Sequence, residues 1–493
     1  MPKEILTNQY QTLIGENVVG AGLQYGVDAP WAVDNQFKIK NTTTGSNTTT
    51  TYESSVLNIY GGLRMGGNAI YGLNIENPAS PNLLFHKTPF DSDFTEMRQI
   101  WSKPTIAEIR LKGERKRVLI FGGGYDASAY ETANANPTSS AGNALYVVNA
   151  SDGTLIWKTT GTGTNSKILT VNSNVKHSVV AQPVVRDYDS DGLADLIYFA
   201  DLGGQIFRVD LNNLAQMSTS VNTNIAVRVQ RIAALAKGTY TPRFYDRLTT
   251  AVFGQGSERF VLVTAGSGNR SFPLESSPEP EKIYGILDYD AAKNGIEKAS
   301  YTGTFSAEAT QDNLYNRGDL GKANTTINGL KTVDSKYMDE AAAQMGSAGS
   351  YRGWYFNLKS KGDSGTAYHA KSFEESQLVQ GDLYINLYDP QASLGTVSQN
   401  CGGGVQGLST IHRVCAPFGS CAAYVTTDYQ GIIGPTLGGL TNPARTTQLI
   451  GPLKPAGEKC IGKCDTDKTT LSDQQLKKYS QARRIRPTRW FEW

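Results

Sequence analysis

The sequence predicts an all-β protein, a modified β-propeller with about seven irregular blades, long loop insertions and a short helix. The composition is the first observation: 51 glycines and 25 tyrosines, with only 19% charged residues, are typical of many short strands joined by tight turns. The second is a strand motif that recurs along the chain. The third is a further apolar strand that precedes several copies of this motif.

The recurring strand has the form small, aliphatic, aromatic, any residue, aliphatic, Asp or Asn. Its copies are GGNAIYGLNI from Gly66, GNALYVVNASDGTLIW from Gly142, GGQIFRVDL from Gly203, KIYGILDYD from Lys282 and GDLYINLYDP from Gly381. The preceding apolar strands include RVLIFGGG from Arg117, LIYFADLGG from Leu196 and RFVLVTAGSG from Arg259. A unit of this size cannot bury both of its faces alone, so stacking and radial closure of such units predict a propeller.

The chain is expected to divide into three parts. Residues 1–55 form an N-terminal extension, 56–400 the propeller core, and 401–493 a cysteine-containing part that closes the propeller. Within the extension, the low-complexity stretch Asn41 to Glu53 predicts a flexible loop. A long insertion from Ser306 to Ala348 contains three alanines, Ala341 to Ala343, that favour a short helix.

All five cysteines follow residue 400: Cys401, Cys415, Cys421, Cys460 and Cys464. Two disulfides and one spare thiol are the simple interpretation; at least one disulfide is expected, with Cys460–Cys464 or Cys415–Cys421 as the favoured local pair. Zinc at Cys460 and Cys464 is the alternative, although their spacing is CxxxC.

The net charge does not favour any class of binding partner, because 47 basic and 45 acidic side chains give a net charge of only +2. We therefore expect no nucleic-acid ligand. No run of 18 apolar residues occurs, which predicts no integral membrane segment, and the first residues lack the pattern of a secretion signal. The composition nevertheless indicates a surface or extracellular protein, of which this chain would be a fragment.

One loop has the residue pattern of a metal site, and it lies within the segment PVVRDYDSDGLADLIYFADLGG. Aspartates stand at its positions 1, 3, 5 and 9, namely Asp187, Asp189, Asp191 and Asp195. Gly192, at position 6, permits a sharp turn, and Leu193, at position 7, would offer its backbone carbonyl oxygen. Ca²⁺ takes six to eight oxygen ligands, so this spacing predicts a calcium site.

Alternatives for this loop are weaker. Position 12 is Tyr198 rather than Glu, and the flanks have strand character, so the loop is no EF-hand. A merely acidic, solvated turn would leave four like charges to repel one another. Mg²⁺ would demand near-octahedral geometry.

No residues stand in a catalytic motif. The four histidines are His86, His177, His369 and His412, and none belongs to a nucleophile or metal pattern. Arg317, Gly318 and Asp319 spell RGD, a tripeptide that some cell receptors recognise on exposed loops; a chance match is the plainer interpretation.

The order of these motifs resembles the C-terminal domain of the PilC/PilY family of type IV pilus biogenesis proteins and tip adhesins. The resemblance runs from about Val56 to the C-terminus and includes YRGWYFNL at Tyr351 and CGGGVQGLST at Cys401. Its most specific element is the aspartate loop, where the family carries calcium. The resemblance implies that Asp187, Asp189, Asp191, Leu193 and Asp195 bind the ion.

The resemblance also implies a role. It implies pilus assembly and surface attachment, with calcium opposing retraction, at the pilus tip on the cell surface. The implied partners are minor pilins, other pilus components, and host or abiotic surface receptors. An enzyme is the competing hypothesis, because GNALYVVNASDGTLIW also looks like the blade repeat of quinoprotein dehydrogenases, which bind calcium and a quinone.

Overall fold

The structure, a computed structural model, describes residues 25–132, 136–219, 224–254, 259–320, 349–360, 367–379, 381–392 and 407–419. A few single residues between these ranges and the backbone of short strands after residue 330 are also described. Within these parts the chain is almost entirely β-structure. Short helices are rare, and α3 (Ala127–Tyr130) lies between two strands of one sheet.

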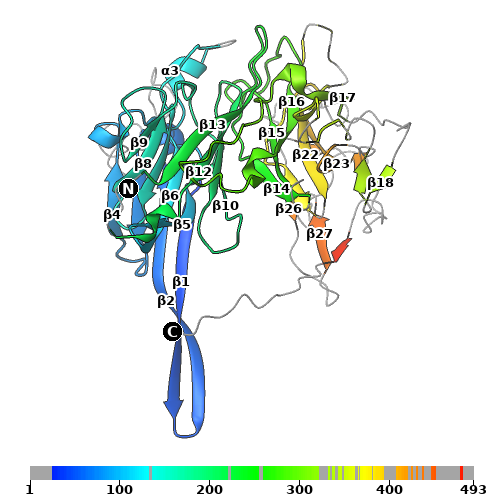
Figure 1. Ribbon diagram of the computed structural model, residues 1–493. Coiled ribbons are helices and arrows are strands. Elements are labelled where there is room, and N and C mark those ends of the chain that lie inside the picture. Colours follow the sequence, from blue (N-terminus) through cyan, green and yellow to red (C-terminus); the bar gives the residue numbers. More distant parts are fainter. Residues whose placement is uncertain are drawn as a thin grey trace, which may run out of the picture.

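The strands form a series of mostly antiparallel sheets that follow the chain in order (Figure 1). The first contains β1 (Ala32–Thr44), β2 (Asn47–Gly62), β3 (Ile70–Asn74) and β4 (Asn82–Lys87). The second contains β5 (Thr105–Leu111), β6 (Glu114–Gly122), β7 (Ala144–Asn149), β8 (Leu155–Thr160) and β9 (Leu169–Val171), and the third contains β10 (Val184–Arg186), β11 (Leu196–Ala200), β12 (Gln205–Leu211) and β13 (Ala226–Ala234).

The later sheets are less regular. The fourth has the order β14 (Thr249–Phe253), β15 (Phe260–Gly266), β16 (Lys282–Asp288), β20 (Gly353–Asn357) and β17 (Tyr315–Asp319), and the fifth contains β21 (Gln377–Val379), β22 (Asp382–Asp389), β23 (Leu408–Cys415), β24 (Tyr424–Val425) and β25 (Tyr429–Gln430). Two small sheets complete the described strands: β18 (Lys331–Val333) with β19 (Lys336–Met338), and β26 (Thr436–Leu437), β27 (Thr446–Ile450) and β28 (Lys478–Ser480).

The repeats of the sequence coincide with these strands. The five aromatic-centred copies contain β3, β7, β12, β16 and β22. The apolar strands that precede three of them are β6, β11 and β15, and each pairs antiparallel with the copy that follows it. The hairpin of each unit is therefore present as the sequence predicted.

The inner strands are buried on both faces, which explains their nearly continuous apolar runs. In β11, Tyr198 packs into a core shared with β15 and β16, whereas Phe199 packs into a core shared with β6 and β7. Side chains alternate between the two faces of a strand, so each sheet contributes to two cores. Burying a side chain of this size stabilises the fold by roughly 1.5 to 3 kcal/mol.

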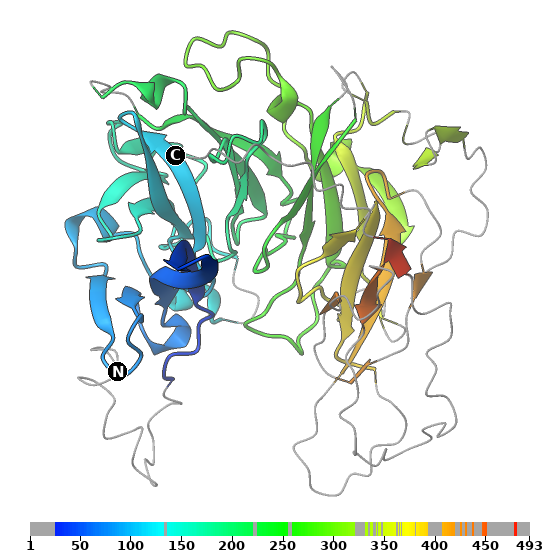
Figure 2. The same cartoon turned by 90° about the horizontal axis from the view of Figure 1, so that it is seen from below.

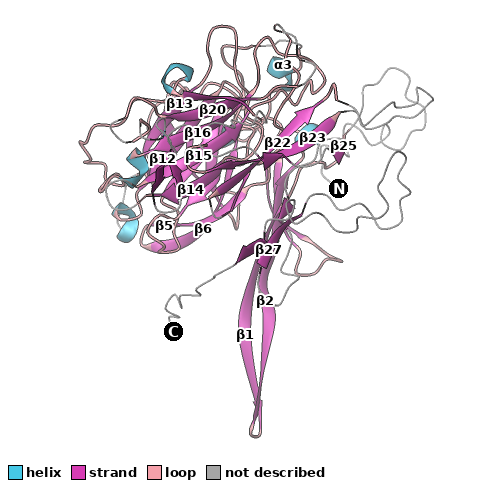
Figure 3. Ribbon diagram, turned by 90° about the vertical axis from the view of Figure 1, so that its right-hand side faces the viewer, coloured by secondary structure: helices cyan, strands magenta, loops and turns pink. Residues whose placement is uncertain are grey.

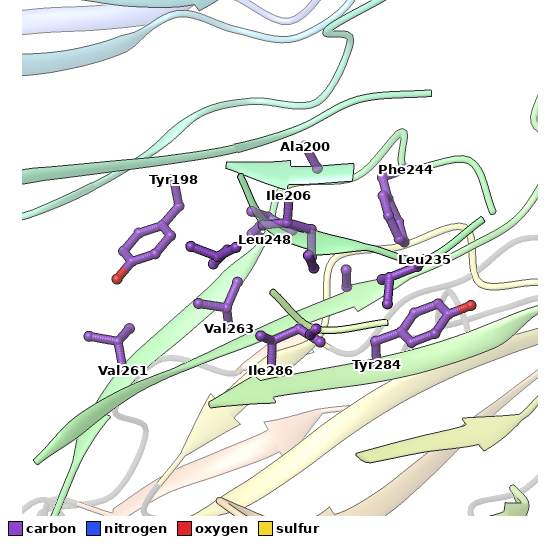
Figure 4. Close-up of a cluster of buried hydrophobic side chains, with 14 of the residues drawn as sticks. Tyr198, Ala200, Ile206, Leu235, Phe244, Leu248, Val261, Val263, Tyr284 and Ile286 are labelled. Atoms are coloured by element: carbon purple, nitrogen blue, oxygen red, sulfur yellow. The ribbon is translucent and has the colours of Figure 1, made fainter. Parts of the chain in front are cut away.

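Figure 4 shows one of these cores between the third and fourth sheets. Its labelled side chains are Tyr198, Ala200, Ile206, Leu235, Phe244, Leu248, Val261, Val263, Tyr284 and Ile286. Seen from below, the sheets lie side by side in chain order, from blue through green to orange (Figure 2). Stacking of successive sheets through shared cores is the packing of a propeller and confirms the predicted fold class. The blade number of about seven and the three predicted part boundaries stay predictions.

The stretch Asn41 to Glu53 is not a flexible loop, so that prediction is wrong. It belongs to the long hairpin of β1 and β2, which projects from the body of the molecule (Figure 3). The pairing continues to Thr44 and Asn47, next to a turn with Gly45 at a φ of 64°. Backbone pairing, rather than a buried face, holds this segment together.

Several predictions fall on parts that the structure does not describe. Ala341 and Ala343 of the predicted helix lie outside the described residues, as do Cys401, Cys421, Cys460 and Cys464. Cys415, at the end of β23, is disulfide-bonded, which agrees with an oxidised cysteine cluster. No helix in the described part of the chain is long and apolar enough to cross a bilayer.

Candidate metal centre

The aspartate loop joins β10 to β11, two strands of the third sheet. Their pairing ends at Arg186 opposite Leu196, and the NH of Asp195 donates to the carbonyl of Arg186 at 2.8 Å. The strands therefore fix both ends of the loop. The segments before and after it are strands, as its sequence predicted.

Three of the aspartates converge. One carboxylate oxygen each from Asp187, Asp189 and Asp195 lies within 4.8 Å of the other two. Asp187 and Asp189 are exposed, whereas Asp195 is half-buried. Three carboxylate oxygens at this separation fit the ligand chemistry of a hard cation such as Ca²⁺, and their mutual repulsion is what such a cation relieves.

Backbone NH groups shape the loop around Asp187. Its Oδ1 accepts from the NH of Ser190 at 2.6 Å, and its Oδ2 accepts from the NH of Gly192 at 2.8 Å. Ser190 and Gly192 have φ values of 65° and 86°, in the left-handed region. Glycine adopts that region without strain, which is why the tight turn needs Gly192.

Asp195 closes the other side of the triad. Its Oδ2 accepts from the NH of Tyr188 at 2.7 Å, and its Oδ1 accepts from the side-chain amide of Asn213 at 3.3 Å. Burial raises the pKa of Asp195 above its usual value, and the charge of Asp189 adds to this effect. A bound cation would favour the ionised form of Asp195.

The other two predicted ligands are placed differently. The Oδ1 of Asp191 accepts from the NH of Leu193 at 2.8 Å, and Asp191 is not among the three converging carboxylates. The carbonyl of Asp191 accepts from Arg115 Nη2 at 2.7 Å. The side chain of Leu193 is buried. The ligand roles of Asp191 and of the Leu193 carbonyl stay predictions.

Two supporting residues carry no signal in the sequence. Asn213 follows β12 and donates to the carbonyl of Ala194 at 2.8 Å as well as to Asp195. Arg115 lies on β6 of the second sheet. Only strand pairing and the packing of neighbouring sheets bring these residues to the loop, so no local motif could have identified them.

A cavity of about 550 Å³ opens beside the loop. Its lining includes three loop aspartates and residues from several neighbouring segments: Asp189, Asp191, Asp195, Arg110, Asp210, Leu211, Asn213, Leu214, Met217, Arg259 and the stretch 291–297. Small-molecule pockets have volumes in this range. An ion held by the triad would therefore lie at the edge of a space that solvent can enter.

The other sequence candidates lie elsewhere. His177 is buried, and its Nδ1 lies 3.4 Å from the hydroxyl of Tyr130. The RGD tripeptide ends strand β17, where Arg317 Nε donates to the carbonyl of Phe418 at 3.0 Å and Asp319 lies 3.3 Å from Lys359 Nζ. These contacts hold the tripeptide against the body of the protein, at the edge strand of the fourth sheet, rather than on a free loop.

Comparison with known proteins identifies related domains. Residues 6–241 match the family model described as the PilY1 beta-propeller domain. The type IV pilus biogenesis factor PilY1 of Pseudomonas aeruginosa (strain UCBPP-PA14) is 24% identical over 324 residues, which cover 61% of this chain and 26% of that protein. The chain thus matches about a quarter of that relative's length.

One solved structure agrees with this fold. The crystal structure of the Pseudomonas aeruginosa PilY1 C-terminal domain superposes with a TM-score of 0.54 and 17% identity, covering 86% of this chain and 82% of that one. A quinohemoprotein alcohol dehydrogenase from Pseudomonas putida reaches a TM-score of only 0.33, with 10% identity. The dehydrogenase similarity is too distant to support a shared chemistry.

Proposed function

We propose that this chain, of which residues 6–241 match the PilY1 β-propeller domain model, acts in type IV pilus biogenesis as a calcium-binding, non-enzymatic domain. The observation that carries the proposal is the convergence of Asp187, Asp189 and Asp195 within one short loop. Asp191 and the carbonyl of Leu193 complete the proposed ligand set.

Calcium suits this loop better than magnesium does. The ligands come from a loop between two strands, two of the three carboxylates are exposed, and the adjoining cavity admits water. Ca²⁺ tolerates variable geometry with six to eight oxygens, whereas Mg²⁺ demands a near-ideal octahedron. Water would supply the oxygens that the loop does not.

Calcium would act as a structural switch. Extracellular calcium modules bind with a Kd of about 10⁻⁴ to 10⁻³ M, near environmental calcium concentrations. At about a hundredfold excess over Kd, binding adds about 2.7 kcal/mol to the stability of the folded form. We propose that this occupancy regulates pilus extension and retraction, twitching motility and surface attachment.

The proposed location is the cell surface at the pilus tip, reached through the periplasm and outer membrane. The proposed partners are minor pilins and other pilus components, with host or abiotic surface receptors in attachment. The alternative, a quinoprotein-like dehydrogenase, predicts a bound chromophore or dye reduction on addition of quinone and calcium. We expect neither.

Calorimetric titration with calcium tests the site. Asp195→Ala removes a central member of the triad and should weaken calcium binding by about tenfold or more, since even outer-shell changes typically cost that much. Asp191→Ala should cost less, because its carboxylate lies outside the triad. Asp152→Ala, at an exposed aspartate in the turn between β7 and β8, is the matched control.

The same variants should be compared for piliation and twitching in cells. A defect in Asp195→Ala that is absent in Asp152→Ala would support the regulatory role. Equal calcium binding by wild type and Asp195→Ala would eliminate this loop as the site.

A further inference from the structure

The hairpin of β1 and β2 stands away from the propeller (Figures 1 and 3). Every residue from Phe37 to Thr44 on β1 and from Asn47 to Ser54 on β2 is exposed. With a rise of about 3.4 Å per residue, β1 extends over about 40 Å. An isolated two-stranded hairpin is marginally stable in water, so a partner surface would stabilise this one.

One face of the hairpin carries four large apolar side chains among polar ones. Val33, Phe37 and Ile39 share a face of β1 because side chains alternate along a strand, and Tyr52 lies directly opposite Ile39 on β2. Their exposed fractions run from 57% to 71%. Four large apolar side chains on one projecting face are more than scattered exposure, and they indicate an interaction surface.

The opposite face is polar, and at its base it is tied to the propeller. Lys40 pairs with Glu53 at 3.0 Å, and both side chains remain exposed. Asp34, on the same face, is buried and pairs with Arg117 of β6 at 3.1 Å. The hairpin is therefore anchored by its polar side, which leaves the apolar face free.

Both edges of the hairpin are open. Among the described strands, β1 pairs only with β2, and β2 pairs with β3 only from Asn58 to Gly62. Unpaired backbone NH and CO groups form a template for another strand. Strand addition uses these groups for affinity and the alternate side chains for specificity.

The area of the apolar face argues against a simple dimer. The stretch from Val33 to Ile39 is about 20 Å long and the two strands are about 10 Å wide, so the apolar part of this face presents roughly 200 Å². Stable interfaces bury about 800 Å² from each partner. Face-to-face packing of two copies therefore falls short, whereas strand addition supplements the apolar contact with a ladder of backbone hydrogen bonds.

We propose that this hairpin is a docking element for a pilus component, which adds its unpaired edge strand to the hairpin and covers Phe37, Ile39 and Tyr52 with an apolar surface. The inference rests on the proposed role in pilus biogenesis. It does not depend on calcium. The chain itself supplies both halves of the recognition, an apolar face and a free edge.

Binding of the whole chain to purified soluble domains of minor pilins tests the proposal. The triple variant Phe37→Thr, Ile39→Thr and Tyr52→Thr keeps β-forming residues and should weaken binding by about tenfold or more, because buried anchors dominate such interfaces. The matched control, Lys38→Thr, Lys40→Thr and Glu53→Thr, changes three residues of the polar face and should bind like wild type. Thermal midpoints should be equal in all three proteins, because the altered side chains are exposed.

Hydrogen exchange distinguishes strand addition from contact through the apolar face alone. Amides along β1 from Asn35 to Thr43 should become protected in the complex. Equal binding by the triple variant and wild type, or no binding by wild type to any minor pilin domain, overturns the proposal. Self-association that the triple variant abolishes would assign the face to a second copy and also overturn it. Calcium titration of wild type is unaffected by any of these outcomes, so it reports separately on the proposed function.

Discussion

Arg208 joins two sheets from a completely buried position on β12. Its Nη1 donates to both carboxylate oxygens of Asp288 on β16, at 2.6 and 2.8 Å, and its Nε donates to Asp210 at 2.6 Å. The hydroxyl of Tyr198 donates to Asp288 at 2.9 Å. Burial by itself lowers the pKa of Arg208, but the attraction of Asp288 and Asp210 raises it overall, so the guanidinium stays charged.

Arg208→Met would remove the charge and keep an apolar chain of similar length. Asp210 retains Arg228 at 2.9 Å, but Asp288 would be left as a buried carboxylate beside Tyr198. Breaking a buried pair from one side costs about 3 to 5 kcal/mol. For 493 residues, an unfolding entropy of about 2.1 cal/mol/K per residue amounts to about 1 kcal/mol/K. The thermal midpoint should therefore fall by about 3 to 5 °C.

Calorimetry of Arg208→Met, Asp288→Leu and the double variant measures this effect. The double variant should be more stable than the sum of the two single losses predicts, because it buries no unpaired charge. Lys40→Met, which breaks the exposed pair with Glu53, is the control and should leave the midpoint unchanged. A wild-type midpoint for Arg208→Met, or strictly additive losses, would refute the reasoning.

Two further predictions concern a histidine and the RGD tripeptide. Burial, and secondarily Lys176, lowers the pKa of His177 from 6.5 to about 4. Its contribution to stability is thus complete above pH 6.5 and is lost as pH falls toward 4, where the unfolded chain binds a proton that the folded chain excludes. Between pH 7 and pH 5 the urea midpoint should fall further for wild type than for His177→Gln. The contributions of all other groups are the same in the two proteins and cancel in the comparison. Equal falls in both proteins would contradict this. For the tripeptide, Asp319→Ala should lower the thermal midpoint and leave cell attachment unchanged, because Asp319 pairs with Lys359 at the edge of the fourth sheet; lost attachment at full stability would show the opposite.

The strands and the aspartate loop could be predicted because their signals are local. Runs such as ALYVVN at Ala144 and LIYFA at Leu196 are apolar almost throughout, which is what a strand buried on both faces requires. The loop from Asp187 to Asp195 combines regular spacing with a glycine where the backbone reaches a φ of 86°. Neither feature depends on distant parts of the chain.

Features that depend on long-range contacts could not be predicted from the sequence. Asn41 to Glu53 has no apolar alternation at its threonine-rich tip, so composition favoured a loop, whereas pairing with the opposite strand makes it a hairpin. Arg208 and Asp210 in FRVD have the alternation of a solvated strand, yet both are buried because Asp288 arrives from the next sheet. The approach of Asn213 to Asp195 likewise follows only from the pairing of β11 with β12.

The aspartate loop is connected to two sheets, and this decides what calcium could change. Arg115 of the second sheet donates to the carbonyl of Asp191, and the NH of Ala194 donates to the carbonyl of Glu108 on β5 at 2.7 Å. The NH of Leu211, at the end of β12, donates to the carbonyl of Asp195 at 2.9 Å. If the loop holds calcium as proposed, ordering the loop would tighten the junction of the second and third sheets. The effect would also reach β12, the strand whose Arg208 pairs with Asp288 of the fourth sheet. A small ion at the surface could thereby bias the packing of three successive sheets, which is the kind of element that a calcium-dependent regulator of assembly requires.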